Sequence, residues 1–166
     1  MQALSKALVY SLAFISGIQS LSSEGRQLEL VKIGSGNFDI GSPKDLDLSI
    51  DAAGFFVTVV ETSDSTISFP YDVKCSDSSK KVDDLFEFQV TKGDKATVRI
   101  KVKPIHVVNV VFSQSIIAKL NVPKGTTFGT VNLTADAGSL TFTNQVAPMD
   151  TLNTTVDAGT IVAQVS

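Results

Sequence analysis

Two aspartates that stand in the same short motif are the strongest candidates for chemistry in this chain. The motif Asp-Ala-Gly begins at Asp136 and returns at Asp157. If both motifs form the same corner in successive layers of a β-structure, the two carboxylates lie about 5 Å apart, the spacing of neighbouring strands. Such a pair could hold a hard cation such as calcium, or each carboxylate could accept hydrogen bonds from the amides of its own corner. Calcium takes roughly six to eight oxygen ligands, and no dense Gly/Asp repeat accompanies the pair, so we predict a structural role and no metal site.

The remaining reactive side chains are few and stand alone. His106 is the only histidine and precedes an apolar run, which is typical of a hydrogen-bonded structural residue. Cys75 is the only cysteine, so it can form neither an internal disulfide nor a thiolate metal site by itself. The glycines at 34 and 36 lack the third glycine and the following helix that a phosphate-binding loop needs. We therefore predict no catalytic residue, no cofactor and no enzymatic activity.

The composition limits the kind of protein. The chain has 166 residues, of which 43% are hydrophobic and 19% charged, with a formal net charge of -3. This balance is typical of one globular domain, and it argues against a nucleic-acid partner because phosphate binding needs a basic surface. Val, Ile and Thr are frequent, while runs of helix-forming residues are rare. The chain is therefore predicted to be all-β.

The first residues have the order of a secretory signal. An apolar stretch at 7–18, within the usual length of about 7–15 residues for such a segment, follows one positive charge and precedes a serine-rich run. A membrane-spanning helix needs roughly 20 apolar residues, so we expect a signal peptide at 1–22, forming a short apolar helix, and no stable membrane span. The rest, 23–166, is then a single all-β domain that is secreted or held at the cell surface. In a eukaryotic host the sequons at Asn132 and Asn153 would be candidates for glycosylation.

Strand patterns begin after the apolar segment. Residues 45–51 alternate strictly between polar and apolar side chains, which predicts a strand with one buried face. Residues 85–103 alternate on both sides of Lys-Gly-Asp at 92–94, which predicts an antiparallel hairpin in the middle of the chain. Pro70 interrupts a further strand pattern and indicates an edge strand or a bulge, because proline donates no hydrogen bond to a ladder.

The last third of the chain is repetitive. The segments 134–142 and 155–163 each contain a short strand, an Asp-Ala-Gly corner and a second strand, with a weaker relative at 50–57 and a fainter one at 36–40. A repeat of about 20 residues is typical of a β-solenoid, or of a solenoid-like stack of short strands, in which glycine permits the corner and equivalent residues lie one above the other. The alternative is a β-sandwich in which the two segments are adjacent hairpins. The predicted corner residues are Asp136, Gly138, Asp157 and Gly159.

Several short motifs together carry a family resemblance. They are the early alternating strands, Val-Arg-Ile-Lys-Val-Lys at 98–103, Leu-Asn-Val-Pro-Lys-Gly at 120–125, and the two Asp-Ala-Gly repeats. In these features residues 28–165 resemble the putative-adhesin domain family of β-solenoid-like proteins. The resemblance implies a solenoid-like fold and, since the family has no established catalytic residues, no site. Relatives commonly continue through further coils, so it also implies that this chain is either a truncated version or has its last coil capped by another molecule.

These observations predict a non-enzymatic, exported, adhesin-like or interaction module of the cell surface. We expect a protein or carbohydrate partner on a flank of outward polar side chains, and an open strand edge after Thr160 that could mediate self-association. The flank residues are Thr141, Thr143, Asn153 and Thr155. One alternative is a polysaccharide-active β-solenoid enzyme that uses Asp136 and Asp157, for which the sequence offers no obvious Lys or Arg partner. The other alternative is a structural scaffold of the envelope.

Overall fold

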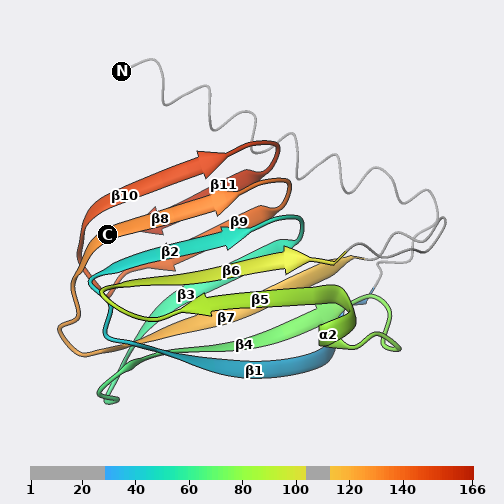
Figure 1. The fold of residues 1–166 in the computed structure, drawn as a ribbon, viewed down its shortest axis with the longest axis horizontal. Coiled ribbons are helices and arrows are strands. Elements are labelled where there is room, and N and C mark those ends of the chain that lie inside the picture. Colours follow the sequence, from blue (N-terminus) through green and yellow to red (C-terminus); the bar gives the residue numbers. More distant parts are fainter. Residues whose placement is uncertain (1–28, 104–112) are drawn as a thin grey trace.

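The computed structural model describes residues 29–103 and 113–166. The expected signal peptide at 1–22 and His106 lie outside these residues. The described residues form eleven strands and one single-turn helix, α2 (Val82–Leu85) (Figure 1). None of the described residues belongs to a helix long and apolar enough to cross a membrane. The strands are β1 (Val31–Gly41), β2 (Asp45–Ile50), β3 (Gly54–Thr62), β4 (Ile67–Cys75), β5 (Phe86–Thr91), β6 (Lys95–Val102), β7 (Gln114–Pro123), β8 (Phe128–Ala135), β9 (Ser139–Asn144), β10 (Met149–Val156) and β11 (Thr160–Val165).

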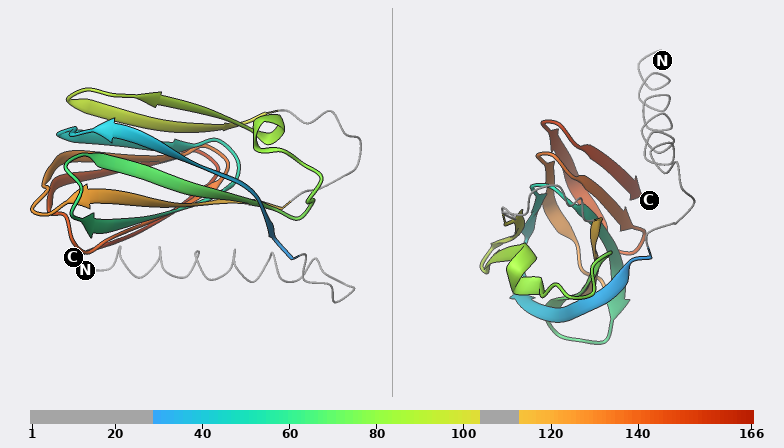
Figure 2. Two further views of the ribbon diagram at one scale, coloured as in Figure 1. Left: turned by 90° about the horizontal axis from the view of Figure 1, so that it is seen from below. Right: turned by 90° about the vertical axis from the view of Figure 1, so that its right-hand side faces the viewer.

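The strands form two mixed sheets that face each other across a common core (Figure 2). The six-stranded sheet has the order β1-β4-β7-β3-β9-β11, and the five-stranded sheet has the order β10-β8-β2-β6-β5. Neighbouring strands are parallel from β6 to β10 in one sheet and from β7 to β11 in the other. Antiparallel pairs are confined to the opposite end, where β1, β4 and β5 lie. The prediction of an all-β fold is confirmed.

Three strand pairs lie above one another in the upper part of Figure 1, namely β2 with β3, β8 with β9, and β10 with β11. Each pair runs along one sheet, turns at a corner and returns along the other sheet. Asn153 of β10 aligns with Asn132 of β8, the same offset that separates Asp157 from Asp136, so the repeated segments of the sequence are neighbours in space. The relative at 50–57 forms the corner directly below them. The segment 36–40 lies in β1, which is antiparallel to β4, so its prediction as a repeat is wrong.

Alternation along the strands builds the core between the sheets. Leu46, Leu48 and Ile50 of β2 are completely buried, as their spacing predicts. Phe55 of β3 and Phe142 of β9 meet them from the other sheet and are also completely buried. Each fully buried side chain of this size contributes roughly 1.5–3 kcal/mol to the free energy of unfolding.

Glycine is required at the corners because the layers approach each other closely. Neither Gly138 nor Gly159 has a positive φ, so the expected reason, freedom to turn the chain, does not apply. A Cβ on Gly138 would lie only 2.7 Å from the backbone nitrogen of Ala53 in the layer below. A Cβ on Gly159 would overlap the carbonyl oxygen of Gly138. Gly159 therefore lies directly above Gly138, as the repeat predicts.

The turn from β9 to β10 is organised by one buried amide. The side chain of Asn144 is almost completely buried, accepts hydrogen bonds from the backbone nitrogens of Val146 and Ala147, and donates one to the carbonyl oxygen of Ala147 at 2.6 Å. A buried amide that found no such partners would destabilise the fold by about 1–3 kcal/mol. These bonds fix the turn that precedes β10, which pairs in register with β8.

Antiparallel strands occupy the other end of the stack. β5 and β6 form the predicted hairpin, in which Glu87 lies opposite Lys101. β4 lies between β1 and β7, so the prediction that Pro70 marks an edge strand is wrong. Pro70 faces Asn37 of β1, and the described ladder from β4 to β7 has no residue pair at the proline. Phe69 has no partner in that ladder either, but the ladder keeps one register because Ser68 and Tyr71 are paired on either side of the gap.

Three aromatic rings close this end between the two sheets. The ring centroid of Tyr71 lies 5.1 Å from that of Phe38 and 4.7 Å from that of Phe88, with the rings stacked. Phe38 and Tyr71 belong to the six-stranded sheet and Phe88 to the five-stranded sheet, so the rings join the two. The Tyr71 ring also covers Gly36, its partner across the strands, where a Cβ would overlap the phenol.

Candidate binding face

The outward side chains of β2, β6, β8 and β10 form one surface, which we call the polar face. These four strands are mutually parallel and in register, so equivalent residues fall into rows that cross the strands. The apolar residues of each strand point into the core, which leaves the polar ones outside. The polar face consists of Asp45, Asp47, Ser49, Lys95, Thr97, Arg99, Thr130, Asn132, Thr134, Thr151, Asn153 and Thr155.

One row is a continuous chain of hydrogen bonds. The Asn132 amide donates to a carboxylate oxygen of Asp47, and the Asn153 amide donates to the Asn132 side-chain oxygen at 2.9 Å. Lys95 Nζ lies 2.7 Å from the other oxygen of Asp47, and this hydrogen bond, reinforced by the charge of Asp47, raises the pKa of Lys95. The side chains of the row therefore hold one another in fixed positions across three layers.

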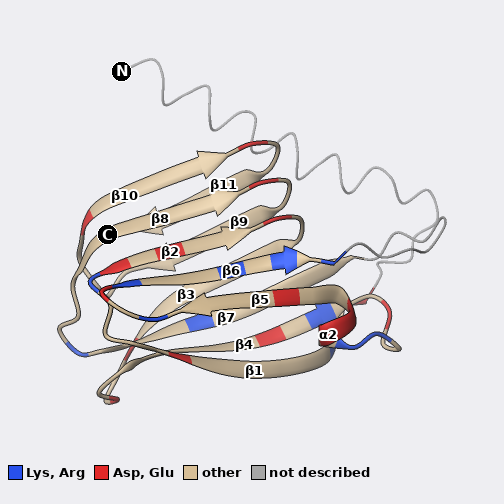
Figure 3. Ribbon diagram, in the orientation of Figure 1, with Lys and Arg blue, Asp and Glu red and all other residues tan. Residues whose placement is uncertain are grey.

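The corner aspartates lie beyond the next row, which Ser49, Thr134 and Thr155 form. Asp51 lies in the layer below Asp136, and Asp136 in the layer below Asp157, so three carboxylates follow one edge of the stack (Figure 3). The prediction that each carboxylate accepts hydrogen bonds from its own corner is wrong for the described residues. The corner amides instead bond between layers, with Ala137 N donating to Asp51 O and Ala158 N donating to Asp136 O, each at 2.6 Å.

Arg99 is the cation beside two of these carboxylates. Its Nη2 lies 3.5 Å from Asp51 Oδ1 and 3.8 Å from Asp136 Oδ2. Desolvation, followed by the hydrogen-bonding contact and charge of Asp51 and by the charge of Asp157, raises the pKa of Asp136, and Arg99 only partly opposes this effect. Asp136 consequently holds a proton more readily than an ordinary exposed carboxylate.

A shallow hollow of about 490 Å³ lies on the polar face between these groups. Its volume falls within the range of roughly 300–1,000 Å³ that is usual for small-molecule sites. Donors and acceptors alternate around it, and the aromatic residues contribute nothing to its lining. The lining residues are Asp47, Leu48, Ser49, Thr97, Arg99, Asn132, Thr134, Asp136 and Thr155.

The predicted flank residues separate into two groups. Asn153 and Thr155 belong to the polar face. Thr141 and Thr143 lie on β9 in the other sheet, so the prediction that all four share one flank is wrong. The outer surface around Thr141 is apolar, since Thr141 lies between Phe56 and Val162, which are 42% and 37% exposed.

The predicted corner residues are brought together, whereas the remaining predicted features stay separate. Asp136, Gly138, Asp157 and Gly159 form adjoining corners. Cys75 is completely buried in the core. Within the described ranges no three His, Cys, Asp or Glu side chains are grouped so that they could hold a metal ion. Of the two sequons, Asn153 is exposed and Asn132 is partly buried, and their use stays a prediction.

The sequence analysis missed most of the residues of the site, and Asp47, Arg99 and Asp51 are the most important of them. The sequence analysis placed Arg99 only within the strand pattern at 85–103, and in that hairpin the structure pairs it with Gln89. Asp51 stands in the weaker relative at 50–57, and superposing that segment on the repeats would have placed it below Asp136. The position of Arg99 beside these corners depends on the parallel pairing of β6 with β2, which joins segments far apart in the chain. No local sequence pattern predicts the pairing of β6 with β2.

Comparison with known proteins finds likenesses at the level of structure. No family model and no curated protein matches the chain. Among solved structures it is similar to a putative cell adhesion protein from Clostridium sporogenes, with 8% identity and a TM-score of 0.35 over 83% of this chain and 100% of that chain. It is also similar to a putative adhesin from Bacteroides fragilis, with 9% identity and a TM-score of 0.33 over 81% of this chain and 97% of that chain.

Proposed function

We propose that this chain is a non-enzymatic, exported, adhesin-like module, built as a solenoid-like stack of strand pairs, that binds carbohydrate through its polar face. The observation that carries the proposal is the hollow between Asp47, Arg99 and Asn132, in which polar side chains are held by one another before any ligand arrives. A site with preformed geometry binds more tightly because little side-chain entropy is lost on association.

The chemistry of the hollow suits hydroxyl groups. Each sugar hydroxyl both donates and accepts a hydrogen bond, and the hollow offers the carboxylate of Asp47, the amide of Asn132, the guanidinium of Arg99 and the hydroxyls of Ser49 and Thr134. The two aspartates of the lining and one arginine leave it without the excess of positive charge that a phosphate ligand needs. Its shallow, partly open form suits part of a polymer chain better than an enclosed metabolite.

The first experiment is binding of the purified full chain to an array of immobilised glycans, followed by calorimetry with the best ligand. Arg99→Ala removes a charged donor whose hydrogen bonds each contribute about 1.5–3 kcal/mol, so affinity is expected to fall roughly 10-fold or more. The matched control is Lys119→Ala, which removes one positive charge from β7 of the other sheet and should leave affinity unchanged.

Two results would contradict the proposal. If no glycan binds, or if Lys119→Ala weakens binding as much as Arg99→Ala, the polar face is not the binding surface.

Export is tested separately, by N-terminal sequencing of the protein recovered from the medium or the cell envelope. A mature protein that begins near Ser23 supports a cleaved signal peptide, and a chain that remains inside the cell with its first residue intact contradicts export.

A polysaccharide-cleaving activity is the second candidate, and one arrangement favours it. Asp136, with its raised pKa, lies beside Asp51 and Arg99, which supplies the cationic partner that the sequence did not reveal. Glycoside hydrolysis uses two carboxyl groups, one of which has a raised pKa and acts as the general acid. Under this candidate, the wild type releases product from a bound polysaccharide and Asp136→Asn loses turnover while it still binds. Binding without product release in the wild type favours the adhesin-like module.

A further inference from the structure

The last strand pair leaves both sheets open at the same end of the molecule. β10 is the final strand of one sheet and β11 the final strand of the other, and among the described residues each is paired along one edge only. The backbone groups along the second edge of each strand are therefore available to a further strand. The two free edges are joined through the corner at Asp157–Gly159 and run in opposite directions.

The core also opens at this end. Val156 and Val165 point inward, because each aligns with a completely or almost completely buried residue of the layer below, Ala135 and Asn144. They are nevertheless 44% and 48% exposed, since no described layer covers them. The open end thus presents two hydrogen-bonding edges with a largely apolar strip between them, whose inward residues are Leu152, Thr154, Val156, Ile161, Ala163 and Val165.

We infer that this end binds a second copy of the same chain in a two-fold symmetric dimer. A single extended peptide could pair with one of the two edges, whereas another open end presents two edges at the same separation and an apolar strip between them. A two-fold axis through Asn153 and Ala163 places β10 antiparallel to the second copy's β10, and β11 antiparallel to the second copy's β11. Both pairings form together because Asn153 and Ala163 lie at equal distances along the chain, on either side, from Ala158 at the corner.

The register of this dimer matches the side chains on the outer face of β10 and on the inner face of β11. On β10, Asn153 lies opposite the second copy's Asn153, and Thr151 lies opposite the second copy's Thr155, so polar residues stay outside and extend the row from Asn132. On β11, Ala163 meets its own copy and Ile161 meets the second copy's Val165, so apolar residues close the core. A shift of one residue in either strand would turn these faces over.

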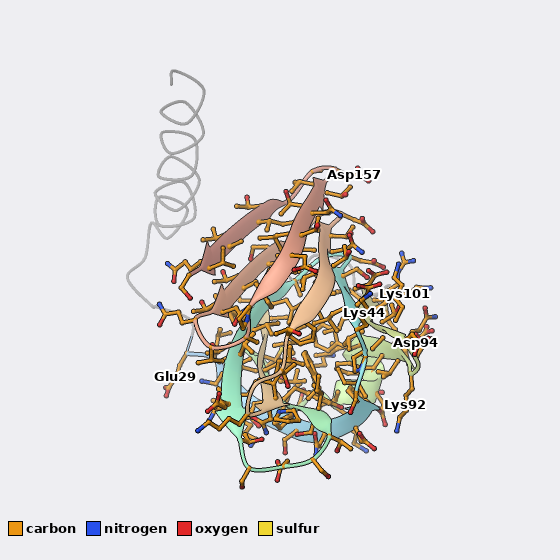
Figure 4. The ribbon with its side chains drawn as sticks, turned by 90° about the vertical axis from the view of Figure 1, so that its left-hand side faces the viewer. Glu29, Lys44, Lys92, Asp94, Lys101 and Asp157 are labelled. Carbon is orange, nitrogen blue, oxygen red and sulfur yellow. The ribbon has the colours of Figure 1, made fainter. Side chains whose placement is uncertain are left out.

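The charges of the open end make a distinct prediction. Residues 149–166 contain two aspartates, Asp150 and Asp157, and neither lysine nor arginine. The labelled lysines of Figure 4 lie lower on the flank, well away from Asp157. The symmetry separates the two Asp157 corners but brings each Asp150 close to the second copy's Asp157. Salt screens this repulsion, so dimerisation should strengthen as the salt concentration rises.

The test is sedimentation of the full chain over a range of protein and salt concentrations. We expect a reversible monomer–dimer equilibrium that moves toward the dimer at high salt. Ala163→Lys places two charges at the symmetry axis and should weaken dimerisation at least 10-fold. Val162→Lys adds the same charge to the same strand on its outer face and should leave the dimer in place. A monomer at every concentration, or equal effects of the two lysines, would overturn the inference.

A cross-link fixes the register independently of these variants. Cβ atoms of residues directly opposite in an antiparallel pair lie about 4.5–5.5 Å apart, close to the span of a disulfide, so Asn153→Cys should form a covalent dimer on mild oxidation. Asn37→Cys, an exposed asparagine on the edge strand β1 at the other end, should form far less. Equal cross-linking of both would overturn the register. The inference does not rest on carbohydrate binding, because Ala163→Lys leaves the hollow unaltered.

Discussion

At the scale of single residues, the absence of two β-carbons decides how closely the layers pack. Gly138 and Gly159 lie within contact distance of the backbone of the layer below, where any side chain would collide. The same close approach allows short hydrogen bonds between successive corners. The aspartates that precede these glycines are consequently held near one another, and their mutual repulsion is a cost of the tight stack.

Gly138→Ala tests the packing of the corner. The added Cβ meets backbone atoms of Ala53, which cannot move aside as a flexible side chain can, so overpacking should lower the free energy of unfolding by about 1–3 kcal/mol. Urea denaturation followed by circular dichroism measures the change. Ser139→Ala, at the exposed neighbouring position, is the control and should change stability little. Equal stability of Gly138→Ala and wild type would contradict the proposed role of the glycine.

Asp136→Asn tests the repulsion between the corner carboxylates. Because the pKa of Asp136 is raised in the folded protein, the folded state binds the proton more tightly than the unfolded state, and stability falls as the pH rises from the ordinary carboxyl range through that raised pKa. Removing the carboxylate should flatten this decline and raise stability at neutral pH by roughly 0.2–0.5 kcal/mol, the size of a like-charge effect at a site that solvent screens.

The measurement is urea denaturation at several pH values between about 4 and 7, the range that begins at the ordinary aspartate pKa. Asp94→Asn, in the turn between β5 and β6, is the control for loss of one negative charge. A variant that is less stable than wild type at neutral pH would show that Arg99 outweighs the other carboxylates, contrary to our expectation.

At the scale of strands, local sequence patterns predicted the single strands and the hairpin, which depend on residues close together in the chain. The alternation at 45–51 indicated β2, and the hairpin at 85–103 is present with its turn at Gly93, whose φ of 137° only glycine adopts readily. Pro70 misled because the ladder between β4 and β7 resumes in the same register after the two unpaired residues, Phe69 and Pro70. The pairing of β2 with β6 and β8 could not be predicted, since it depends on contacts between segments far apart in the chain.

Phe88→Ala tests whether the aromatic rings hold the two sheets together at the closed end. Loss of a half-buried ring that stacks on Tyr71 and lies against Phe38 should lower the free energy of unfolding by about 1–3 kcal/mol. Phe56→Ala, which removes an identical side chain from the outer face of β3, is the control and should have a smaller effect. Similar losses for the two variants, measured by urea denaturation, would contradict a joining role for Phe88.

At the scale of the whole molecule, the two ends of the stack differ. One end is closed by β1, β4 and β5 with their aromatic rings, and the other ends in β10 and β11, which among the described residues are paired along one edge only and carry an exposed, largely apolar strip. The sequence predicted that the repeat segment at 155–163 lies above 134–142, and the structure places it there. It did not predict the closed end, because the rings of Phe38, Tyr71 and Phe88 come from three separate strands.

The constant offset between the upper layers gives the molecule a direction of growth. A tandem duplication of one strand pair in the coding sequence would insert an extra layer. The strands of this layer could pair with the layers above and below it, and its corner and polar side chains would align with theirs. A similar insertion is not possible at the closed end, because β1, β4 and β5 are antiparallel to their neighbours. Proteins with this fold are therefore expected to differ in the number of layers at the end that carries the Asp-Ala-Gly corners. Each added layer would extend every row of the polar face by one residue.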